Sequence, residues 1–475
     1  MFLLEEKVMN SIAVIIFEKI SLETAKKMGF EKLEFNMETT FIEICRLVLQ
    51  KLIIAIDEKE GHPEKIFVEI ENIMKTFSKK NSGSMPVLSL FGMVDLPYSR
   101  YENKQTHKAK SINHIDYKEP DRTSPNVKKI ILKQTPYTNF KESTDTLYNL
   151  KRINISESGL KDISREICEE HGEWFRNMIK EKNINSKEKS LKKQADRIVI
   201  SNDGGRIKLI QSEKNTGRNA KKNAEWKEVK MGETYEIDEN GNKSDNIFAY
   251  GLINKKWEKI EPFLKYSVNA FGISDCKQFE TLSDCGNGIK EMYLRNFGEP
   301  DNKKYFDSAD FYHCAEHLCE AAKIVHMNSN CQDKLSPEAN SWYEKHKDIL
   351  YSQSGEELVR IFNLEAEINT DFAKIKDKVS TYFDNNYKRM NFPILVENKL
   401  PIGSGVMEAK IRTANNKRFK GNNIYWREDN AENLLLLKCT LENNCFEQWW
   451  EFRNKNLSHW NCVYDMKFNH MSSKN

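Results

Sequence analysis

The sequence predicts a mixed α/β protein with a mainly helical N-terminal region and a helical insertion inside its α/β part. Two strand-like segments each end on an aspartate, Asp203 and Asp284, and a loop containing glycines precedes Glu408. Between them, residues 332–392 are charged, have helical spacing and contain no strand candidate. A sheet whose strand ends bear acids, interrupted by helices, is the simplest arrangement that fits this order.

Composition excludes several classes of protein. The chain has 475 residues, of which 39% are hydrophobic and 31% charged, so it is neither collagen-like nor wholly disordered. No apolar run approaches the length of a membrane span, and the N-terminus lacks the features of a signal peptide. The ten widely spaced cysteines suit reduced thiols. We therefore expect a cytoplasmic protein, and the net charge of +3 alone does not indicate a partner.

The N-terminal half is expected to contain three segments. Apolar residues at helical spacing, clearest over residues 39–57, predict a helical domain over residues 1–85. Residues 86–150 are expected to hold two short strands around Gly92 and then a loop-rich linker. Residues 151–195 form a basic segment, helical over residues 156–182, that is either a solvated face or a candidate for DNA binding.

The following α/β elements are predicted from hydrophobic pattern and turn residues. Residues 197–202 form a strand, and the pair Gly204-Gly205 after it predicts a hairpin with residues 206–210 as the partner strand. The remaining expected elements are a strand within 226–237, a helix over 256–270, strands over 278–283 and 305–309, a helix from Asp310 to about Met327, an extended segment over 393–401, and a helix capped by Ser404.

Three carboxylates stand at the ends of these elements. Asp203 and Asp284 follow strands, and Glu408 lies in the first turns of a helix. Acids brought together in this way repel one another unless cations compensate, and hard oxygen ligands suit Mg²⁺ or Mn²⁺. Two such ions would stabilise the attacking and leaving oxygens of an in-line phosphoryl displacement. Taken singly, each acid also fits an ordinary turn or helix-start residue.

Several motifs resemble those of bacterial insertion-sequence DDE transposases, more narrowly the Kra-type family, relatives of the Mutator-like group. The resemblance covers residues 196–455 and is fainter over residues 88–101. It rests on these motifs in order: Asp203-Gly204-Gly205-Arg206, the W-K-E-V-K-M-G stretch of Trp226–Gly232, Asp284–Ile289, the D-F-Y-H-C-A-E-H-L stretch of Asp310–Leu318, Tyr387–Pro393, and Leu400–Ala409.

The resemblance implies a ribonuclease H-like fold that binds two Mg²⁺ or Mn²⁺ ions through Asp203, Asp284 and Glu408. Asp310 and His313 would form the Asp-x-x-His pair of this group, near the active site but outside the triad. The fold would occupy residues 196–310 and 395–455, interrupted by a helical insertion over 311–394 and followed by a tail over 456–475. The implied activity is cleavage and strand transfer at the ends of an insertion sequence.

A basic stretch after Glu408 is the strongest candidate for DNA contact. It combines cations with Phe419, Tyr425 and Trp426 and contains no acid. Cations neutralise phosphates and aromatic rings stack on unpaired bases. The residues expected to bind DNA are Lys410, Arg412, Lys417, Arg418 and Lys420. The expected partners are double-stranded DNA, both terminal repeats and target, and further copies of the chain in a homodimer or higher oligomer.

The sequence departs from the family in two places, and alternatives stay open. The family's Cys-x-x-Cys zinc element is missing, and His107 and His114 alone would not hold a structural zinc. Asp284 is followed by Cys285-Gly286 instead of Gly-Ala. One alternative is therefore a DNA-binding derivative without catalysis. Another is a zinc protease, because His313–His317 fits the H-x-x-E-H motif.

Overall fold

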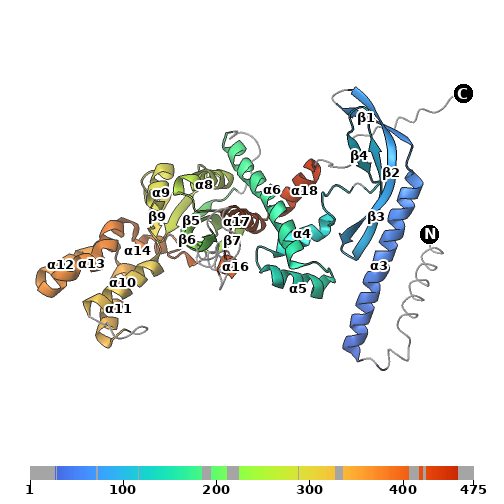
Figure 1. Ribbon diagram of the computed structural model, residues 1–475. Helices are drawn as coiled ribbons and strands as arrows, with labels where there is room; N and C mark the ends of the chain where they lie inside the picture. Colours follow the sequence, from blue (N-terminus) through green and yellow to red (C-terminus); the bar gives the residue numbers. More distant parts are fainter. Residues whose placement is uncertain are drawn as a thin grey trace. The chain divides into compact units, whose positions relative to one another are not determined.

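The computed structural model describes residues 27, 29–70, 73–115, 117–184, 194–210, 224–286, 288–326, 335–405, 417–420 and 424–457. The chain divides into two compact units (Figure 1): Met1–Ser164 together with Gln448–Asn475, and Arg165–Glu447. Within the described ranges, every helix is too short or too polar to cross a membrane.

The first unit is built on a long helix and an antiparallel sheet. Helix α3 (Phe30–Glu60) is followed by strands in the order β1-β2-β3-β4. The strands are β1 (Lys65–Ile70), β2 (Ile73–Ser89), β3 (Gly92–Glu102) and β4 (Ala109–Ile112). Ile53 of α3 packs against Val87, Val94 and Leu96 of β2 and β3, so one stripe of the helix covers the sheet.

Two expectations for this region were wrong. Residues 1–85 are not all helical, because strand β1 begins at Lys65 and β2 at Ile73. The linker expected after residue 102 contains β4, α4 (Pro125–Gln134) and α5 (Phe140–Lys151). Residues 80–84 of β2 are exposed and polar. The strand therefore lacks an alternating hydrophobic pattern there, and the sequence alone does not indicate it. The strand pair around Gly92 is confirmed, with longer strands than expected.

Buried ions join the remaining helices of the first unit. The Glu119 carboxylate accepts a hydrogen bond from Lys128 Nζ of α4 at 2.7 Å and from Arg453 Nη1 and Nη2 of α18 (Phe446–Asn456) at 2.7 and 3.0 Å. All three side chains are at most 4% exposed. Since a lone buried charge is costly, each of these residues depends on its partners.

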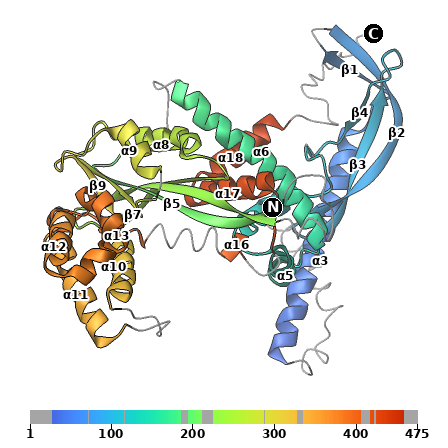
Figure 2. The same cartoon turned by 60° about the vertical axis from the view of Figure 1, so that its left-hand side comes forward.

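The second unit contains a five-stranded mixed sheet (Figure 2) in the order β7-β6-β5-β8-β9. The strands are β5 (Arg197–Ile210), β6 (Ala224–Ile237), β7 (Lys243–Ile253), β8 (Gln278–Ser283) and β9 (Tyr305–Ala309). Strands β5, β6 and β7 are antiparallel neighbours, whereas β8 pairs in parallel with both β5 and β9. The expected α/β class is therefore confirmed.

Helices cover both faces of this sheet. Ile198 and Ile200 face one core, made with helices α6 (Glu157–Ile184), α8 (Trp257–Phe271), α9 (Ile289–Phe297) and α17 (Glu428–Glu442). Val199, Leu282 and Phe306 face the opposite core. That core is made with α10 (Phe311–Val325), α11 (Pro337–Ser352), α12 (Gly355–Ile368), α13 (Thr370–Asn386) and α14 (Phe392–Glu397). The alternation along β5 follows the two-residue period of a strand.

The predicted hairpin at Gly204-Gly205 does not form. Strand β5 runs through both glycines, which pair with Lys230 and Val229 of β6. Neither glycine has a positive φ, so the pair is extended instead of turning. The partner of β5 is β6, the strand expected within residues 226–237.

Most other elements of the second unit are confirmed, with two differences. The helices expected at residues 156–182 and 256–270 are present as α6 and α8, and residues 335–386 are helical apart from short connections. Strand β7 was not expected from the sequence. The segment over 393–401, expected to be extended, begins with helix α14, where Pro393 occupies the first turn. Proline is tolerated there because the first helical amides have no intrahelical acceptor.

The pH dependence of stability tests the packing of α6 against α17. His171 of α6 is buried and shares a 2.8 Å hydrogen bond with Thr440 of α17. Burial lowers the pKa of His171 to about 3. The unfolded chain takes up a proton near pH 6.5 and the folded chain does not, so stability present above about pH 6.5 is lost as the pH falls toward 3.

We expect the free energy of unfolding to fall by about 2 kcal/mol more between pH 7 and pH 5 in the wild type than in His171→Gln. Urea denaturation at both pH values measures this difference. The exposed His326 offers a matched control, and His326→Gln should keep the wild-type pH dependence. Equal pH dependence in wild type and His171→Gln would show that His171 titrates normally.

Candidate active site

The strand register brings three aspartates to one edge of the sheet. In the parallel pair β5–β8, Ser201 lies opposite Leu282, and continuing this register by two residues sets Asp203 beside Asp284. In the pair β8–β9, Ser283 lies opposite Ala309, and the next step sets Asp284 beside Asp310. Residues opposite one another share a face, and here it is the face covered by α10–α14.

Asp203 and Asp284 are both half-buried at this edge. Asp203 lies within β5, two residues beyond the end of its parallel pairing, and the amide of Gly204 donates to its carboxylate. Asp284 follows β8 directly, and its Oδ1 accepts a hydrogen bond from the amide of Gly286 at 2.8 Å. The next residue, Cys285, has a φ of 65°, so the chain turns sharply there. Both carboxylates thus lie just beyond the point where the parallel pairing of β5 with β8 ends. Strand β5 itself continues to Ile210, so Asp203 lies within its strand and does not follow it as the sequence predicted. Asp284 follows the C-terminal end of β8, a position where α/β proteins bind ligands.

Asp310 has a different environment from the other two acids. It is 1% exposed and caps helix α10. Its Oδ1 accepts from the amides of Tyr312 and His313 at 2.7 and 3.0 Å, and its Oδ2 accepts from the amide and hydroxyl of Ser404. A carboxylate that accepts from four donors has its lone pairs engaged. Asp310 therefore ties the start of α10 to the loop that leads toward Glu408.

The third acid of the predicted triad lies outside the described residues. Glu408 falls in the range 406–416, together with Lys410 and Arg412. The preceding motif is described as far as Gly405, which is helical. Gly403 needs to be glycine because a Cβ would lie 2.5 Å from the ring of Tyr312. The close approach of this loop to α10 explains part of the motif.

The motif at Trp226–Gly232 also has a structural explanation. Gly232 of β6 lies opposite Asn202, the residue before Asp203. A Cβ at Gly232 would clash with the side chains of Asn202 and Tyr250. Asn202 is fully buried and donates to Met231 O and Tyr250 Oη at 3.3 Å each, while Tyr293 donates to its Oδ1 at 3.0 Å. The motif glycine thus leaves room for the network that holds β5 next to Asp203.

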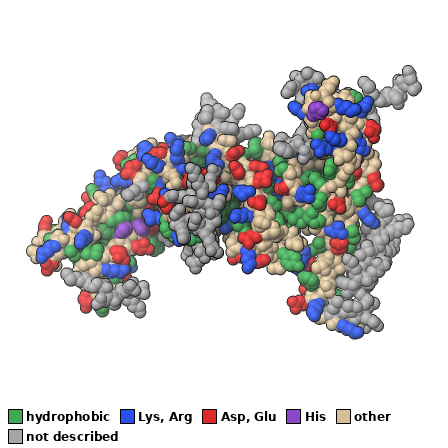
Figure 3. Space-filling model, viewed as in Figure 1, with side chains coloured by type: hydrophobic (Ala, Val, Ile, Leu, Met, Phe, Trp, Pro, Cys, Tyr) green, Lys and Arg blue, Asp and Glu red, His purple; other side chains and the backbone are tan. Residues whose placement is uncertain are grey.

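His313 and His317 form a close pair on α10. Their Nε2 atoms are 3.2 Å apart, and they line a cavity of about 300 Å³ with Glu316, Cys319 and Glu320. Figure 3 shows histidine side chains at the surface in the region of α10–α13. Burial and the neighbouring His313 lower the pKa of His317. In the described part of the chain, no third His, Cys, Asp or Glu completes a metal-ligand group with this pair, so the geometry does not favour the zinc-protease alternative.

The basic stretch is described only in part. Helix α16 (Lys417–Phe419) carries Arg418, which is 3% exposed and has its guanidinium 4.8 Å from the ring centroid of Trp426. Lys420 is half-buried, and the side chain of Lys417 is not described. Arg418 therefore packs on an aromatic ring in this structure, and its expected phosphate contact stays a prediction.

Arg389 is a residue near the site that the sequence did not single out. It lies in the 3₁₀ turn η1 (Tyr387–Arg389) and is 4% exposed. Its Nη2 donates to Ser283 Oγ at 3.0 Å, Ser308 O at 3.1 Å and Asp307 Oδ1 at 2.9 Å, and its Nη1 lies 3.1 Å from Cys285 Sγ. It thereby joins the ends of β8 and β9. Only its place in the Tyr387–Pro393 motif could have indicated it.

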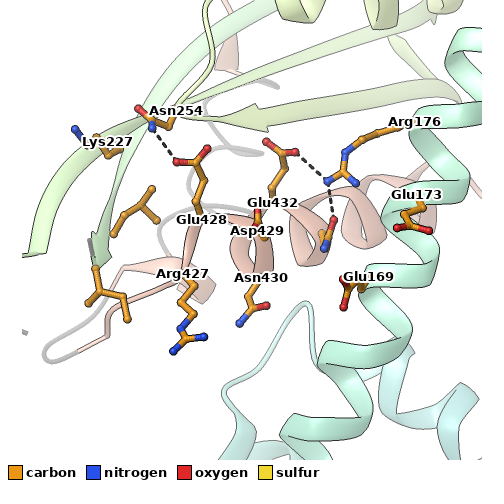
Figure 4. A pocket seen from close by; sticks show the side chains of 13 residues that line it. Glu169, Glu173, Arg176, Lys227, Asn254, Arg427, Glu428, Asp429, Asn430 and Glu432 are labelled. Carbon is orange, nitrogen blue, oxygen red and sulfur yellow. Dashed lines mark hydrogen bonds and ion pairs between the residues drawn. The ribbon is translucent and has the colours of Figure 1, made fainter. Parts of the chain in front are cut away.

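A larger cavity of about 880 Å³ lies elsewhere in the second unit, between α6, α17 and the ends of β5–β7. Figure 4 shows acidic side chains from both helices at its wall, with Arg176 bonded to Glu432 at 2.9 Å and Asn254 bonded to Glu428 at 2.8 Å. None of the predicted site residues whose side chains the structure describes lines it. Glu432 and Glu428 of the cavity wall are thus bonded to a cation and an amide of the same wall, which indicates a structural role for them.

Comparisons with known proteins give little further information. The sequence matches no protein-family model and no curated protein. Among solved structures it is similar to the Drosophila P element transposase strand transfer complex, with 9% sequence identity and a TM-score of 0.25 over 73% of this chain and 84% of that chain. A likeness of this size supports no conclusion about the family or the activity of this chain.

The ion pair under the site yields a stability prediction. Arg389→Ala would leave Asp307, whose side chain is 8% exposed, without its cation. Removing one partner of a buried pair costs about 3–5 kcal/mol, and we expect this loss in the free energy of unfolding by urea denaturation. The exposed neighbour Lys388 is the matched control, and Lys388→Ala should cost about 0.5 kcal/mol or less. Similar losses in the two variants would mean that Arg389 does not hold the strand ends.

Proposed function

We propose that this protein is a DNA transposase that cleaves and joins phosphodiesters with two Mg²⁺ or Mn²⁺ ions. The observation that carries the proposal is the register of β5 and β8, which, continued two residues past its last pair, sets Asp203 beside Asp284 on one face of the sheet. Half-buried carboxylates on neighbouring strands repel each other, and divalent cations relieve such repulsion. Glu408, which follows the loop held by Asp310, is proposed as the third ligand.

The residues fit the proposed ions in chemistry. Carboxylate oxygens are the ligands that Mg²⁺ and Mn²⁺ prefer, and Asp203 and Asp284 are accessible enough to admit a substrate phosphate. When bound, a metal pair activates the attacking hydroxyl and stabilises the leaving oxygen of an in-line displacement. Asp310 has its oxygens engaged and is proposed to position the Ser404 loop, and His313 to orient the site from the first turn of α10.

The architecture supports a ribonuclease H-like domain. The second unit has a mixed sheet with helices on both faces, and helices α11–α13 stand between β9 and the loop before Glu408. This order is the interrupted layout that the motif resemblance implies. The basic residues after Glu408 are proposed to meet the DNA backbone, because the acids of the site would otherwise repel it.

A second candidate is a DNA-binding derivative without catalysis. The altered residues after Asp284 favour it. Cys285 has a positive φ, which is uncommon for residues other than glycine, and its sulfur contacts Arg389. This candidate predicts DNA binding without cleavage.

Metal-dependent nicking of DNA separates the two candidates. The substrate is a duplex carrying the sequences that flank the reading frame, incubated with the full chain and Mn²⁺. We expect nicking by the wild type and a loss of about 10²–10³-fold or more in Asp203→Asn, Asp284→Asn and Glu408→Gln, because each removes a charged carboxylate that would hold the metal ions.

The exposed Asp275 of the same unit provides the control, and Asp275→Asn should retain wild-type nicking. DNA binding by gel shift, measured on every variant, shows whether loss of cleavage is loss of substrate. Binding without any nicking by the wild type would reject the transposase proposal and favour the second candidate.

Asp310 should affect the rate more than metal affinity. Asp310→Ala removes the cap of α10 and releases the Ser404 loop, so we expect nicking to fall about 10–100-fold, as for supporting residues around metal sites. Ser404→Ala should reduce nicking less, because the backbone amide still bonds to Asp310. Mn²⁺ affinity, measured by calorimetry, should change little in both variants. Complete loss of Mn²⁺ binding in Asp310→Ala would make Asp310 a metal ligand instead.

A further inference from the structure

The first unit contains a cluster of metal-ligand side chains far in sequence from the candidate active site. Asp57 lies in the last turn of α3, His62 follows the Gly61 turn, and His114 lies two residues after β4. One ligand atom from each of the three lies within 4.8 Å of the others. The three residues come from two separate parts of the chain that the sheet brings together.

The contacts within the cluster leave ring nitrogens available. His62 Nε2 and Asp57 Oδ1 are 2.9 Å apart, and the His62 and His114 ring centroids are 4.7 Å apart. His62 Nδ1 and His114 Nε2 are sealed from solvent and have no hydrogen-bond partner. Buried polar atoms without a partner are rare in folded proteins, and a missing ion is one of their explanations.

The surroundings hold the cluster in place. The side chains of Asp57 and His62 are 17% and 12% exposed. Asn113 Oδ1 accepts hydrogen bonds from the amides of Ile115 and Tyr117 at 3.2 and 3.0 Å, which fixes the turn that carries His114. Ile115 packs on the core between α3 and the sheet. A ligand set on ordered backbone loses little entropy when it binds an ion.

We propose that Asp57, His62 and His114 bind a transition-metal ion, best Zn²⁺, that ties the end of α3 to the segment after β4. Imidazole nitrogens favour Zn²⁺ over Mg²⁺ or Ca²⁺, which take oxygen ligands. His62 Nε2 and Asp57 Oδ1, which are 2.9 Å apart, would both face the ion, which would take the place of the proton between them. Three protein ligands leave a fourth position for water or another donor.

This cluster changes the expectation that no structural zinc is held in this region. That expectation paired His114 with His107, whose side chain is 82% exposed and outside the cluster. The structure instead pairs His114 with His62 and Asp57. Asp57 and His62 are five residues apart, and His114 lies far from both in sequence. This spacing matches no recognisable zinc motif.

Zinc titration of the full chain tests the proposal. The chain is made without a histidine tag, stripped with a chelator and titrated with Zn²⁺ against a chromophoric competitor, with excess Mg²⁺ to occupy oxygen-ligand sites. We expect His114→Ala and His62→Ala to remove one zinc ion per chain that the wild type binds, and Asp57→Asn to weaken that ion at least about tenfold. His107→Ala is the matched control and should bind zinc as the wild type does.

A second variant and a second measurement keep the result clear. His317→Ala removes the other close histidine pair, and it should leave the zinc ion of the first unit in place. Co²⁺ should give a visible ligand-field band that His114→Ala loses and His317→Ala keeps. Absence of zinc binding by the wild type overturns the proposal whether or not the variants fold. Loss of the ion in His317→Ala with retention in His114→Ala also overturns it.

Discussion

The parallel pairing of β8 with β5 and β9 is the constraint on which the candidate site depends. Because β8 pairs in parallel on both sides, the parallel pairing with β5 and with β9 ends at the same edge, where β8 and β9 stop and β5 runs on to Ile210. The register then fixes which residues meet there, and a shift by one residue would turn each aspartate to the opposite face. Asp203, Asp284 and Asp310 reach one edge without any contact among their own side chains being needed.

The charges near this edge are distributed unequally. Glu280 lies on the same strand face as Asp284, but burial raises its pKa to about 8 and Ser308 donates to it. At neutral pH it is therefore mostly protonated and adds little negative charge. Asp307 is paired with Arg389, and Asp310 accepts hydrogen bonds from four donors. Asp203 and Asp284, the two acids that the motifs indicate, are half-buried.

The sequence predicted strand ends better than it predicted strand partners. Hydrophobic runs located β8 and β9 and placed Asp284 and Asp310 correctly, since a buried parallel strand has a strong local pattern. It misread Gly204-Gly205 as a turn, because a glycine pair is equally compatible with an extended strand whose partner lies far along the chain. Arg389, Asn202 and the pairing of His62 with His114 were missed for the same reason: the partner of each lies 29 or more residues away, so no local spacing indicates it.

Asp310 also explains how a helical insertion can stand inside the α/β unit without displacing the site. The insertion begins at Phe311, and its return at Ile402 is bonded to the same point, because the Phe311 amide donates to Ile402 O at 2.8 Å. Ser404 then bonds to the Asp310 carboxylate, so both ends of the insertion are fixed to one residue at the end of β9. The entropy of closing a loop rises only slowly with its length, so the cost of the insertion depends little on its size once its ends are joined. The helices between pack on one face of the sheet, in one core with Val199, Leu282 and Phe306, while the loop toward Glu408 keeps its place relative to the strands.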